Sequence, residues 1–397
     1  MHTTVKLFNI YFRLILFLLF LLTIGCENHS FNNKESLKPI SKGKNYNQVK
    51  SLTDLLEVET AFPLEQNDLF FSDDPKLAML TESGIFLSDE RGNNLFRFHL
   101  DGSFDRRIAA AGEGPRDVHR LHFGTRIFDD LLAFWELQRA HLVVFSAQGE
   151  FKFRVDLRNP IKVPGKQVPI GTAFAWPTKD RLILAGVFDG TEQKIGTALY
   201  QVSWTSDGEI ERIQFDTMLC YRERHPEQKY GDGTADHLVQ VGETFWLGSP
   251  DFSRLTFLSP TEPSKVVYDI QVPDPLTPAL YDQVDWSNRR NRFELFNKNG
   301  MVHDIQTFSN LILVKVGALG YVPFDPDGTQ LAEHRIRANM STLKDVYEET
   351  GLFITNRKYV LFLEEHIGRT IRIPSDYDRE DEEQPFVVLT RLKPDFR

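Results

Sequence analysis

The feature that most constrains this chain is a strand-turn-strand unit that recurs at intervals of roughly fifty residues. In the first copy, apolar segments at 84–88 and 94–99 are followed by a turn and a third segment at 104–108. Further copies follow the same order at 131–155, 181–215, 244–270, 311–336 and 351–390. A period of this size is typical of propellers and solenoids, in which each repeat is one supersecondary unit.

Glycine marks the tight turn in most of these copies. The turn dipeptides are Asp101-Gly102, Gln148-Gly149, Asp207-Gly208 and Asp327-Gly328. Glycine adopts the positive φ that a two-residue hairpin needs, so these dipeptides between apolar alternations predict β-hairpins.

Six copies predict an all-β fold, a six-bladed β-propeller over residues 52–397. A four-stranded blade cannot bury both of its faces alone, and radial stacking closes the ring and leaves only short edges. Residues 54–62 have the pattern of a strand that pairs with the last blade and closes this ring. The alternatives are an open all-β array and two β-sandwiches.

The N-terminus predicts export. Lys6 and Arg13 precede an apolar run over residues 14–24, which is shorter than the roughly 20 residues that span a bilayer. The run suits a secretory signal over residues 1–25, followed by Cys26 and a polar tether over residues 26–51. The alternative is an uncleaved anchor helix, and both interpretations place the globular part outside the cytoplasm.

Cysteine content and net charge limit which modifications and binding partners the chain is expected to have. The chain has only two cysteines, Cys26 and Cys220, so no disulfide framework explains Cys26. The formal net charge is −10, and the leader carries no acid, so the exported part is still more acidic. Nucleic acid, which selects a basic face, is therefore not an expected partner. The acidic run at 376–383 is interpreted as a solvated loop, with a weak cation site as the alternative.

Two motifs carry a resemblance to a known family. Residues 22–26 read Leu-Thr-Ile-Gly-Cys, which resembles a bacterial lipobox with Cys26 as the lipidated (palmitate-bearing) residue. Residues 112–115 read Gly-Glu-Gly-Pro and, with the preceding Asp101-Gly102 hairpin, resemble a junction of the six-bladed β-propeller lipoproteins common in Bacteroidota. That family is related to the NHL-repeat propellers, and the resemblance implies a lipid-anchored membrane protein of the cell envelope. The glycines and Pro115 are interpreted as a structural crossover between blades.

Three histidines form the candidate metal site. His119, His237 and His303 each lie near the start of a predicted innermost strand, so a propeller places them near one mouth of its channel. Three neutral imidazoles with an open fourth position suit catalytic zinc. Amidating lyases, which are also NHL-like propellers, use histidines from different blades in this manner. Channel histidines bound to backbone and water are the alternative interpretation. Asp304 and His122 would act beside such a metal.

A basic and aromatic segment over residues 286–296 is the candidate ligand surface. It carries Arg289, Arg290 and Arg292 and reads as a short helix or lid. Arginine matches carboxylate and phosphate geometry, while the alternative is an amphipathic cover with solvated arginines.

The sequence favours a non-catalytic module that binds a small molecule or a protein partner. No Gly-x-Ser-x-Gly motif is present to support nucleophilic hydrolysis. The competing hypothesis is a metal-dependent lyase or hydrolase at the channel mouth, with zinc as its cofactor.

Overall fold

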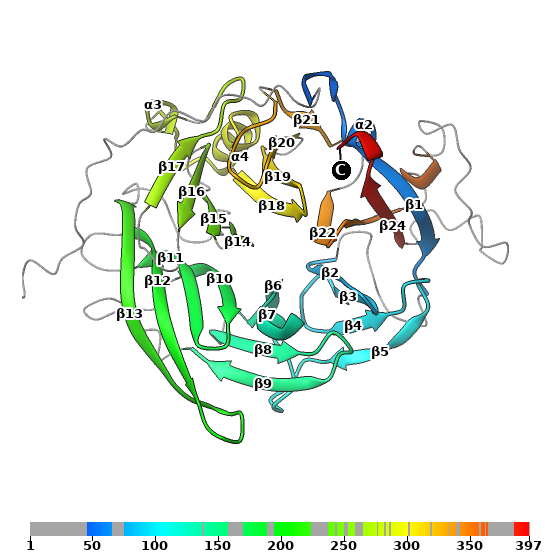
Figure 1. Cartoon of the computed structure of the whole chain (residues 1–397), viewed down its shortest axis with the longest axis vertical. Coiled ribbons are helices and arrows are strands. Elements are labelled where there is room, and N and C mark those ends of the chain that lie inside the picture. Colours follow the sequence, from blue (N-terminus) through cyan, green and yellow to red (C-terminus); the bar gives the residue numbers. More distant parts are fainter. Residues whose placement is uncertain are drawn as a thin grey trace, which may run out of the picture.

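Six four-stranded sheets surround a central axis (Figure 1). The computed structural model describes residues 46–65, 75–136, 139–157, 170–188, 194–223, 237–242, 244–249, 253–258, 265–275, 277–281, 283–285, 287–300, 302–317, 320–332, 334–338, 342–356, 359–361, 363 and 385–396. The signal, Cys26, residues 27–45 of the tether and the acidic run at 376–383 lie outside these residues. The predicted end of the tether at residue 51 is wrong, because Tyr46 and Val49 are buried in the core between blades 5 and 6.

Each blade is an antiparallel meander that runs from the inside to the outside. Blades 1 to 3 comprise β2 (Ala78–Thr81), β3 (Gly84–Ser88), β4 (Leu95–Phe98) and β5 (Phe104–Ala109); β6 (Leu121–Arg126), β7 (Leu132–Glu136), β8 (His141–Phe145) and β9 (Phe151–Asp156); and β10 (Ile170–Thr178), β11 (Arg181–Phe188), β12 (Lys194–Trp204) and β13 (Ile210–Glu223). Blades 4 and 5 comprise β14 (His237–Val241), β15 (Thr244–Ser249), β16 (Arg254–Leu258) and β17 (Lys265–Asp269), then β18 (Val302–Phe308), β19 (Leu311–Val316), β20 (Gly320–Phe324) and β21 (Ile336–Arg337).

Blade 6 joins the two ends of the folded chain. It comprises β22 (Leu343–Tyr347), β23 (Thr350–Asn356), β24 (Pro385–Leu392) and, as its outermost strand, β1 (Leu56–Pro63). The register of β1 against β24 runs from the pair Leu56 and Leu392 to the pair Pro63 and Phe386. The predicted closing strand is confirmed, but it begins at Leu56. Residues 54 and 55 belong to a helical turn, because the Asp54 carboxylate accepts the Ser51 N–H at 2.9 Å.

The six-bladed β-propeller predicted from the repeats is thus confirmed, with two corrections to its strands. Residues 359–361, predicted as a strand of the last repeat, are helical, and β22 supplies the inner strand that completes that blade. The outer strand predicted at 331–336 is reduced to β21, which pairs only Gly320 with Arg337 and Tyr321 with Ile336. Both errors have the same cause: apolar residues such as Val360 and Leu331 are buried although they belong to no strand.

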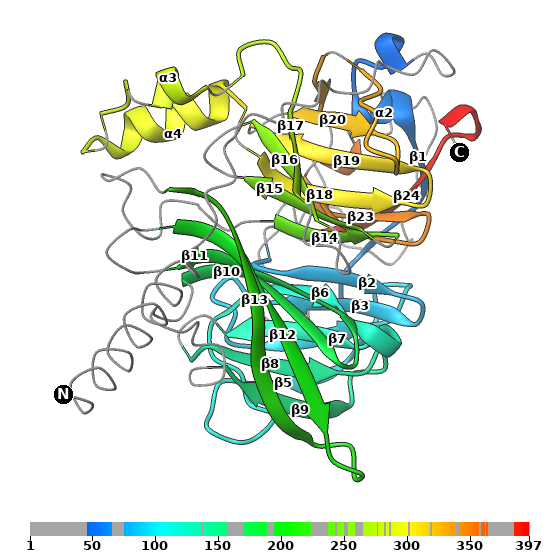
Figure 2. The ribbon, with the colours of Figure 1, turned by 60° about the vertical axis from the view of Figure 1, so that its left-hand side comes forward.

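The helices are short and lie outside the sheets. Besides the helical residues 359–361, the described helices are η1 (Tyr46–Gln48), α2 (Leu52–Leu55), η2 (Phe128–Asp130), α3 (Pro278–Tyr281), α4 (Arg289–Lys298) and η3 (Pro394–Phe396). Figure 2 shows α3 and α4 projecting from the side of the propeller that carries β15 to β17. The β12–β13 hairpin extends far beyond the other blades. No helix in the described ranges is long and apolar enough to cross a membrane.

The hydrophobic core lies between blades. Six clusters of buried residues occur in the described part of the chain, and each joins two neighbouring blades. Trp135 of blade 2, for example, packs in one cluster with Phe174 and Trp176 of blade 3. Each blade therefore buries its two faces only because it has a neighbour on either side, which is the physical reason for the closed ring.

The hairpin turns follow the predicted chemistry. Gly102, Gly149, Gly208 and Gly328 all have positive φ, between 81° and 88°. Gly102 also allows close packing, because a Cβ there would lie 2.3 Å from the Pro63 carbonyl oxygen on the closing strand. The blade 1 hairpin and the ring closure thus depend on the same glycine.

Candidate functional site at the channel mouth

The innermost strands form the wall of the channel. Strands β2, β6, β10, β14, β18 and β22 contact one another in this order, and β22 contacts β2 (Figure 1). Because every blade is the same meander, all six innermost strands begin at one mouth. His237 is the first residue of β14, His303 the second of β18, and His122 the second of β6.

A cluster of titratable side chains occupies this mouth. We call His122, His237, His303, Asp304 and Lys315 the channel-mouth cluster. His237 Nδ1 lies 3.8 Å from Asp304 Oδ1. The side chains of these two residues keep 29 % and 27 % of their surface accessible, so a small ligand can reach them.

Asp304 is held by hydrogen bonds from its own strand. Its carboxylate accepts the Gln306 Nε2–H at 2.6 Å and the Ile305 N–H at 2.9 Å. On the neighbouring strand β19, Lys315 Nζ donates to Thr342 Oγ1 at 3.1 Å, just before β22. Blades 4, 5 and 6 thus meet around one carboxylate and one ammonium group.

The channel keeps the imidazoles neutral. Burial, with the charge of Lys315 acting in the same direction, lowers the pKa of His237 to about 4. Burial, Lys315 and His237 together lower the pKa of His303 to about 4. Burial also lowers the pKa of His122, with Lys76 and His237 acting in the same direction. Neutral imidazole offers one donor and one acceptor nitrogen, and the buried Nε2 of His303 has no hydrogen-bond partner in the described part of the structure.

Burial acts oppositely on Asp304, raising its pKa to about 6, although Gln306 and Lys315 favour its ionised form. The cluster therefore combines neutral imidazoles with a carboxyl group that titrates near neutral pH. Such displaced pKa values are typical of binding and catalytic sites.

These pKa values predict a pH dependence of stability. The two histidines have lowered pKa values, so the stability they contribute is present above pH 6.5 and is lost as pH falls. Asp304 has a raised pKa, so its contribution is present below pH 3.8 and is lost as pH rises through 6. Between pH 4 and 6 the unfolded chain binds two protons on His237 and His303, while the folded chain binds one on Asp304.

The unfolded chain therefore binds one more proton than the folded chain, so the free energy of unfolding rises by about 1.4 kcal/mol per pH unit between pH 4 and 6. In Asp304→Asn the opposing proton is absent, so the slope is expected to steepen by about 1.4 kcal/mol per unit. Urea unfolding at several pH values in this window measures both slopes. Equal slopes in the wild type and the variant would contradict the assignment.

His119 does not join this cluster. It lies two residues before β6, and its backbone N–H donates to Glu136 Oε1 of blade 2 at 2.6 Å. No group of three or more His, Cys, Asp and Glu side chains in the described ranges is arranged to hold a metal ion. The expected convergence of His119 with His237 and His303 is therefore corrected, because blade 2 anchors the segment around His119. These residues do not fit the predicted zinc site.

His122 is the histidine of blade 2 whose charge interacts with His237. The local sequence pattern gave no signal for this exchange. His122 lies within β6, at its bulge between Leu121 and Phe123, whereas His119 precedes the strand. The strand boundary at Leu121 therefore distinguishes the two histidines.

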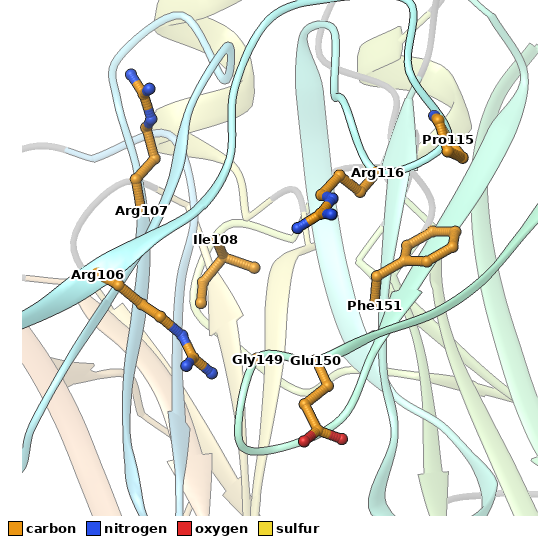
Figure 3. A pocket seen from close by; sticks show the side chains of 8 residues that line it. All are labelled: Arg106, Arg107, Ile108, Pro115, Arg116, Gly149, Glu150 and Phe151. Atoms are coloured by element: carbon orange, nitrogen blue, oxygen red, sulfur yellow. The ribbon is translucent and has the colours of Figure 1, made fainter.

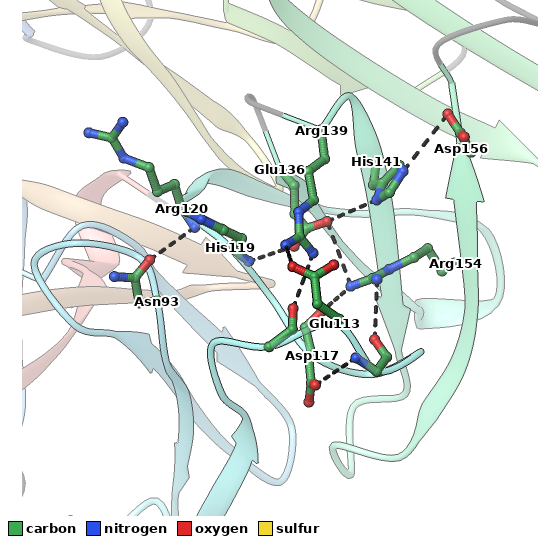
Figure 4. A network of polar contacts seen from close by, with 12 residues as sticks. Asn93, Glu113, Asp117, His119, Arg120, Glu136, Arg139, His141, Arg154 and Asp156 are labelled. Atoms are coloured by element: carbon green, nitrogen blue, oxygen red, sulfur yellow. Dashed lines mark hydrogen bonds and ion pairs between the residues drawn. The ribbon is translucent and has the colours of Figure 1, made fainter.

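The Gly-Glu-Gly-Pro junction belongs to a separate polar network (Figure 4). Asp117 Oδ2 accepts the Gly114 N–H at 2.7 Å, and a Cβ on Gly112 would lie 2.2 Å from the same oxygen. Arg139 donates to the Gly112 carbonyl at 3.1 Å, and Arg154 donates to the carbonyls of Gly114 and Asp117. The glycines thus admit a carboxylate that closes the loop, which agrees with the predicted structural crossover.

Glu136 is at the centre of this network. Its side chain is fully buried, and besides the His119 N–H it contacts His141 Nδ1 at 3.2 Å and Arg154 Nη2 at 3.6 Å. Burial lowers the pKa of His141 although Glu136 opposes this shift, so we assign Arg154 as the cation that balances Glu136.

A second ion pair crosses the inside of the channel. Arg126 at the end of β6 contacts both carboxylate oxygens of Asp345 on β22 and the Leu80 carbonyl on β2. Asp345 also accepts the Leu80 N–H at 2.7 Å. Blades 6, 1 and 2 are therefore joined by one partly buried pair, for which the sequence offered no spacing signal.

The predicted arginine surface is only partly described. Arg289, Arg290 and Arg292 lie in α4, whose first turn is capped by the Asn288 side chain. Arg290 is exposed and paired with Glu294 at 2.8 Å, and the side chains of Arg289 and Arg292 lie outside the described residues. The helix predicted for this segment is confirmed, and its role in binding stays a prediction.

These observations define a six-bladed β-propeller with a polar, titratable channel mouth. A model of the DUF5128 family, described as a 6-bladed beta-propeller, matches residues 27–123. The match includes all of blade 1 and the first half of β6. Comparison with curated proteins gave no match.

Solved structures share the fold at low sequence identity. A Bacteroides fragilis protein described as exported is 11% identical, with 90% of this chain and 99% of that chain covered and a TM-score of 0.55. A DUF4221 family member from Bacteroides vulgatus is 12% identical, with coverage of 85% and 98% and a TM-score of 0.48. Virginiamycin B lyase from Staphylococcus aureus is 12% identical, with coverage of 84% and 99% and a TM-score of 0.41. The likeness to the Bacteroides fragilis protein concerns the fold alone.

Proposed function

We propose that this chain is an exported, lipid-anchored β-propeller that binds a small polar ligand at its channel mouth without transforming it. The observation that carries the proposal is the channel-mouth cluster, in which neutral imidazoles from blades 2 and 4 approach His303, Asp304 and Lys315 of blade 5. Ligand sites commonly combine such convergent polar groups with displaced pKa values.

The chemistry of the cluster favours a ligand rich in hydroxyl groups. Each neutral imidazole supplies a donor and an acceptor, Asp304 accepts, and Lys315 donates. A hydroxyl group also donates and accepts, so neighbouring hydroxyls of a sugar match this alternation. The free Nε2 of His303 is a nitrogen that such a ligand would satisfy.

A thermal shift assay tests the binding proposal. The purified protein is heated with neutral sugars, amino acids and dicarboxylates as probes. A probe at about 100 times its Kd is expected to stabilise the folded state by about 2.7 kcal/mol. His303→Gln is expected to abolish the rise in Tm caused by a sugar. His99→Gln, which changes an exposed residue between the outer strands β4 and β5 of blade 1, should retain it. An equal rise in Tm in His303→Gln, or no rise with any probe, would contradict the proposal.

The lipid anchor is the second part of the proposal. It is supported by the leader that ends at Cys26 and by the description of the Bacteroides fragilis protein of similar fold as exported. The polar tether at residues 27–45 would let the propeller stand away from the membrane.

Replacing Cys26 with serine removes the thiol that would carry the lipid. We expect Cys26→Ser to lose fatty-acid labelling and to move from the membrane fraction to the soluble fraction of the envelope. Cys220→Ser is the matched control and should keep both properties. Labelling that persists in Cys26→Ser would show that the anchor lies elsewhere.

A further inference from the structure

A second candidate site lies at the junction of blades 1 and 2, remote in sequence from the channel-mouth residues of blades 4 and 5. A pocket of about 510 Å³ opens between strand β5, the loop after it and the β8–β9 turn (Figure 3). Arg106, Arg107 and Ile108 come from β5, Arg116 from the loop, Gly149 from the turn and Phe151 from the start of β9. The volume lies within the range of small-molecule sites.

The pocket concentrates unused positive charge. Arg107 and Arg116 have no hydrogen-bond or ion-pair partner in the part of the chain that the structure describes. Arg106 donates one hydrogen bond, from Nη2 to the Gln148 carbonyl at 2.5 Å. Glu150 also lines the pocket, but Lys152 balances it at 2.9 Å. The guanidinium groups therefore remain available for an anion, and their planar fork matches carboxylate and phosphate oxygens.

The blade 2 wall is fixed before any ligand arrives. Ser83 of blade 1 donates to the Ala147 carbonyl at 3.3 Å, which holds the β8–β9 turn against blade 1. At the same turn, Gly149 packs so tightly that a Cβ would lie 2.4 Å from Ile108 Cδ1. A preformed wall lowers the entropy cost of binding.

The loop that carries Arg116 is braced on both sides. Gly114 donates to the Asp117 carboxylate, and Arg154 donates to the carbonyls of Gly114 and Asp117. Figure 3 shows the Arg116 guanidinium directed toward Ile108, with the Arg106 guanidinium on the other side of that residue. Arg106 and Arg116 thus lie on either side of Ile108, and Phe151 is a second apolar group in the lining.

We propose that this pocket binds an organic anion in which a carboxylate or phosphate group is attached to an apolar ring. The anion would take up the N–H groups of Arg116 and Arg106, and the ring would lie on Ile108 and Phe151. Arg107 at the rim adds attraction for the approaching anion. This site is independent of the channel mouth, so either proposal stands if the other fails.

Calorimetric titration of the full chain with phenyl phosphate and with benzoate tests this inference. Binding of either anion is the expected result, and the two arms distinguish phosphate from carboxylate ligands. Arg116→Ala is expected to weaken that binding at least tenfold. Arg212→Ala, which removes an exposed arginine from the outer strand β13, should leave it unchanged.

Two further probes separate the contributions of charge and ring. Phenol should bind much more weakly than phenyl phosphate because it lacks the anion, and inorganic phosphate should bind more weakly because it lacks the ring. The inference is overturned if neither aromatic anion binds, if phenol binds as tightly as phenyl phosphate, or if Arg116→Ala binds like the wild type. Urea unfolding of Arg116→Ala confirms that the variant is folded.

Discussion

Replacing Glu136 with alanine is expected to lower the free energy of unfolding by about 3–5 kcal/mol, the range for breaking a buried ion pair. The Glu136 side chain is fully buried, and its loss leaves the Arg154 guanidinium without its counter-ion and the His119 N–H without its acceptor. Leaving such groups buried and unpaired costs more than the pair contributes. Urea unfolding of the purified variant measures the effect.

Glu113→Ala is the matched control in the same junction. Glu113 also pairs with an arginine, at 2.6 Å from Arg139, but 89 % of its side-chain surface is exposed. Exposed pairs contribute about 0–1 kcal/mol, so this variant should unfold nearly as the wild type does. A Glu136→Ala variant no less stable than Glu113→Ala would show that Glu136 does not brace the junction.

Replacing Asp345 with alanine is expected to lower the free energy of unfolding by about 1–3 kcal/mol, less than the loss of the fully buried Glu136, because the side chains of Arg126 and Asp345 keep 26 % and 15 % of their surface exposed. The substitution leaves Arg126 without its carboxylate and the Leu80 N–H without its acceptor, so the contact among blades 6, 1 and 2 is lost. Because the lost contact joins three blades, opening of the ring near β2 is also expected. Hydrogen exchange of β2 and β22 amides, together with urea unfolding, measures both effects.

Two further variants test this reasoning. Asp216→Ala removes an exposed pair within blade 3, 2.6 Å from Arg181, and should cost no more than about 1 kcal/mol. Asp345→Leu combined with Arg126→Met replaces both charges by apolar groups. It should be less destabilised than the sum of the single variants, because no charge is left alone. Additive losses would argue against direct coupling of the two residues.

The blades were predictable because their signals are local. Alternation of apolar residues and the positive φ of Gly102 and Gly149 are set within a few residues of the chain, and β3 spans the predicted residues 84–88. The closing strand was also predictable, since Leu56 and Val58 alternate with Glu57 and Glu59 at its start. The strand predicted from Tyr359 failed because a short apolar run does not distinguish a strand from a buried helical turn.

The candidate site was predictable only in part. His237 and His303 were found because a propeller brings the starts of its inner strands together. His119 was chosen in place of His122 because the choice depends on where β6 begins, and a strand boundary is not set by local pattern alone. The arginine pocket gave no signal, since Arg106, Arg116 and Phe151 belong to two blades and a loop.

By itself, the sequence determined the repeat, its hairpins, the six-bladed ring and the strand that closes it, because each depends on short-range patterning of apolar residues and glycine. The tertiary structure decided which polar side chains meet. Arg126 and Asp345 are 219 positions apart, and Asp304 and His237 come from different blades. Such contacts depend on the radius and twist of the closed ring, which every blade sets jointly with its neighbours.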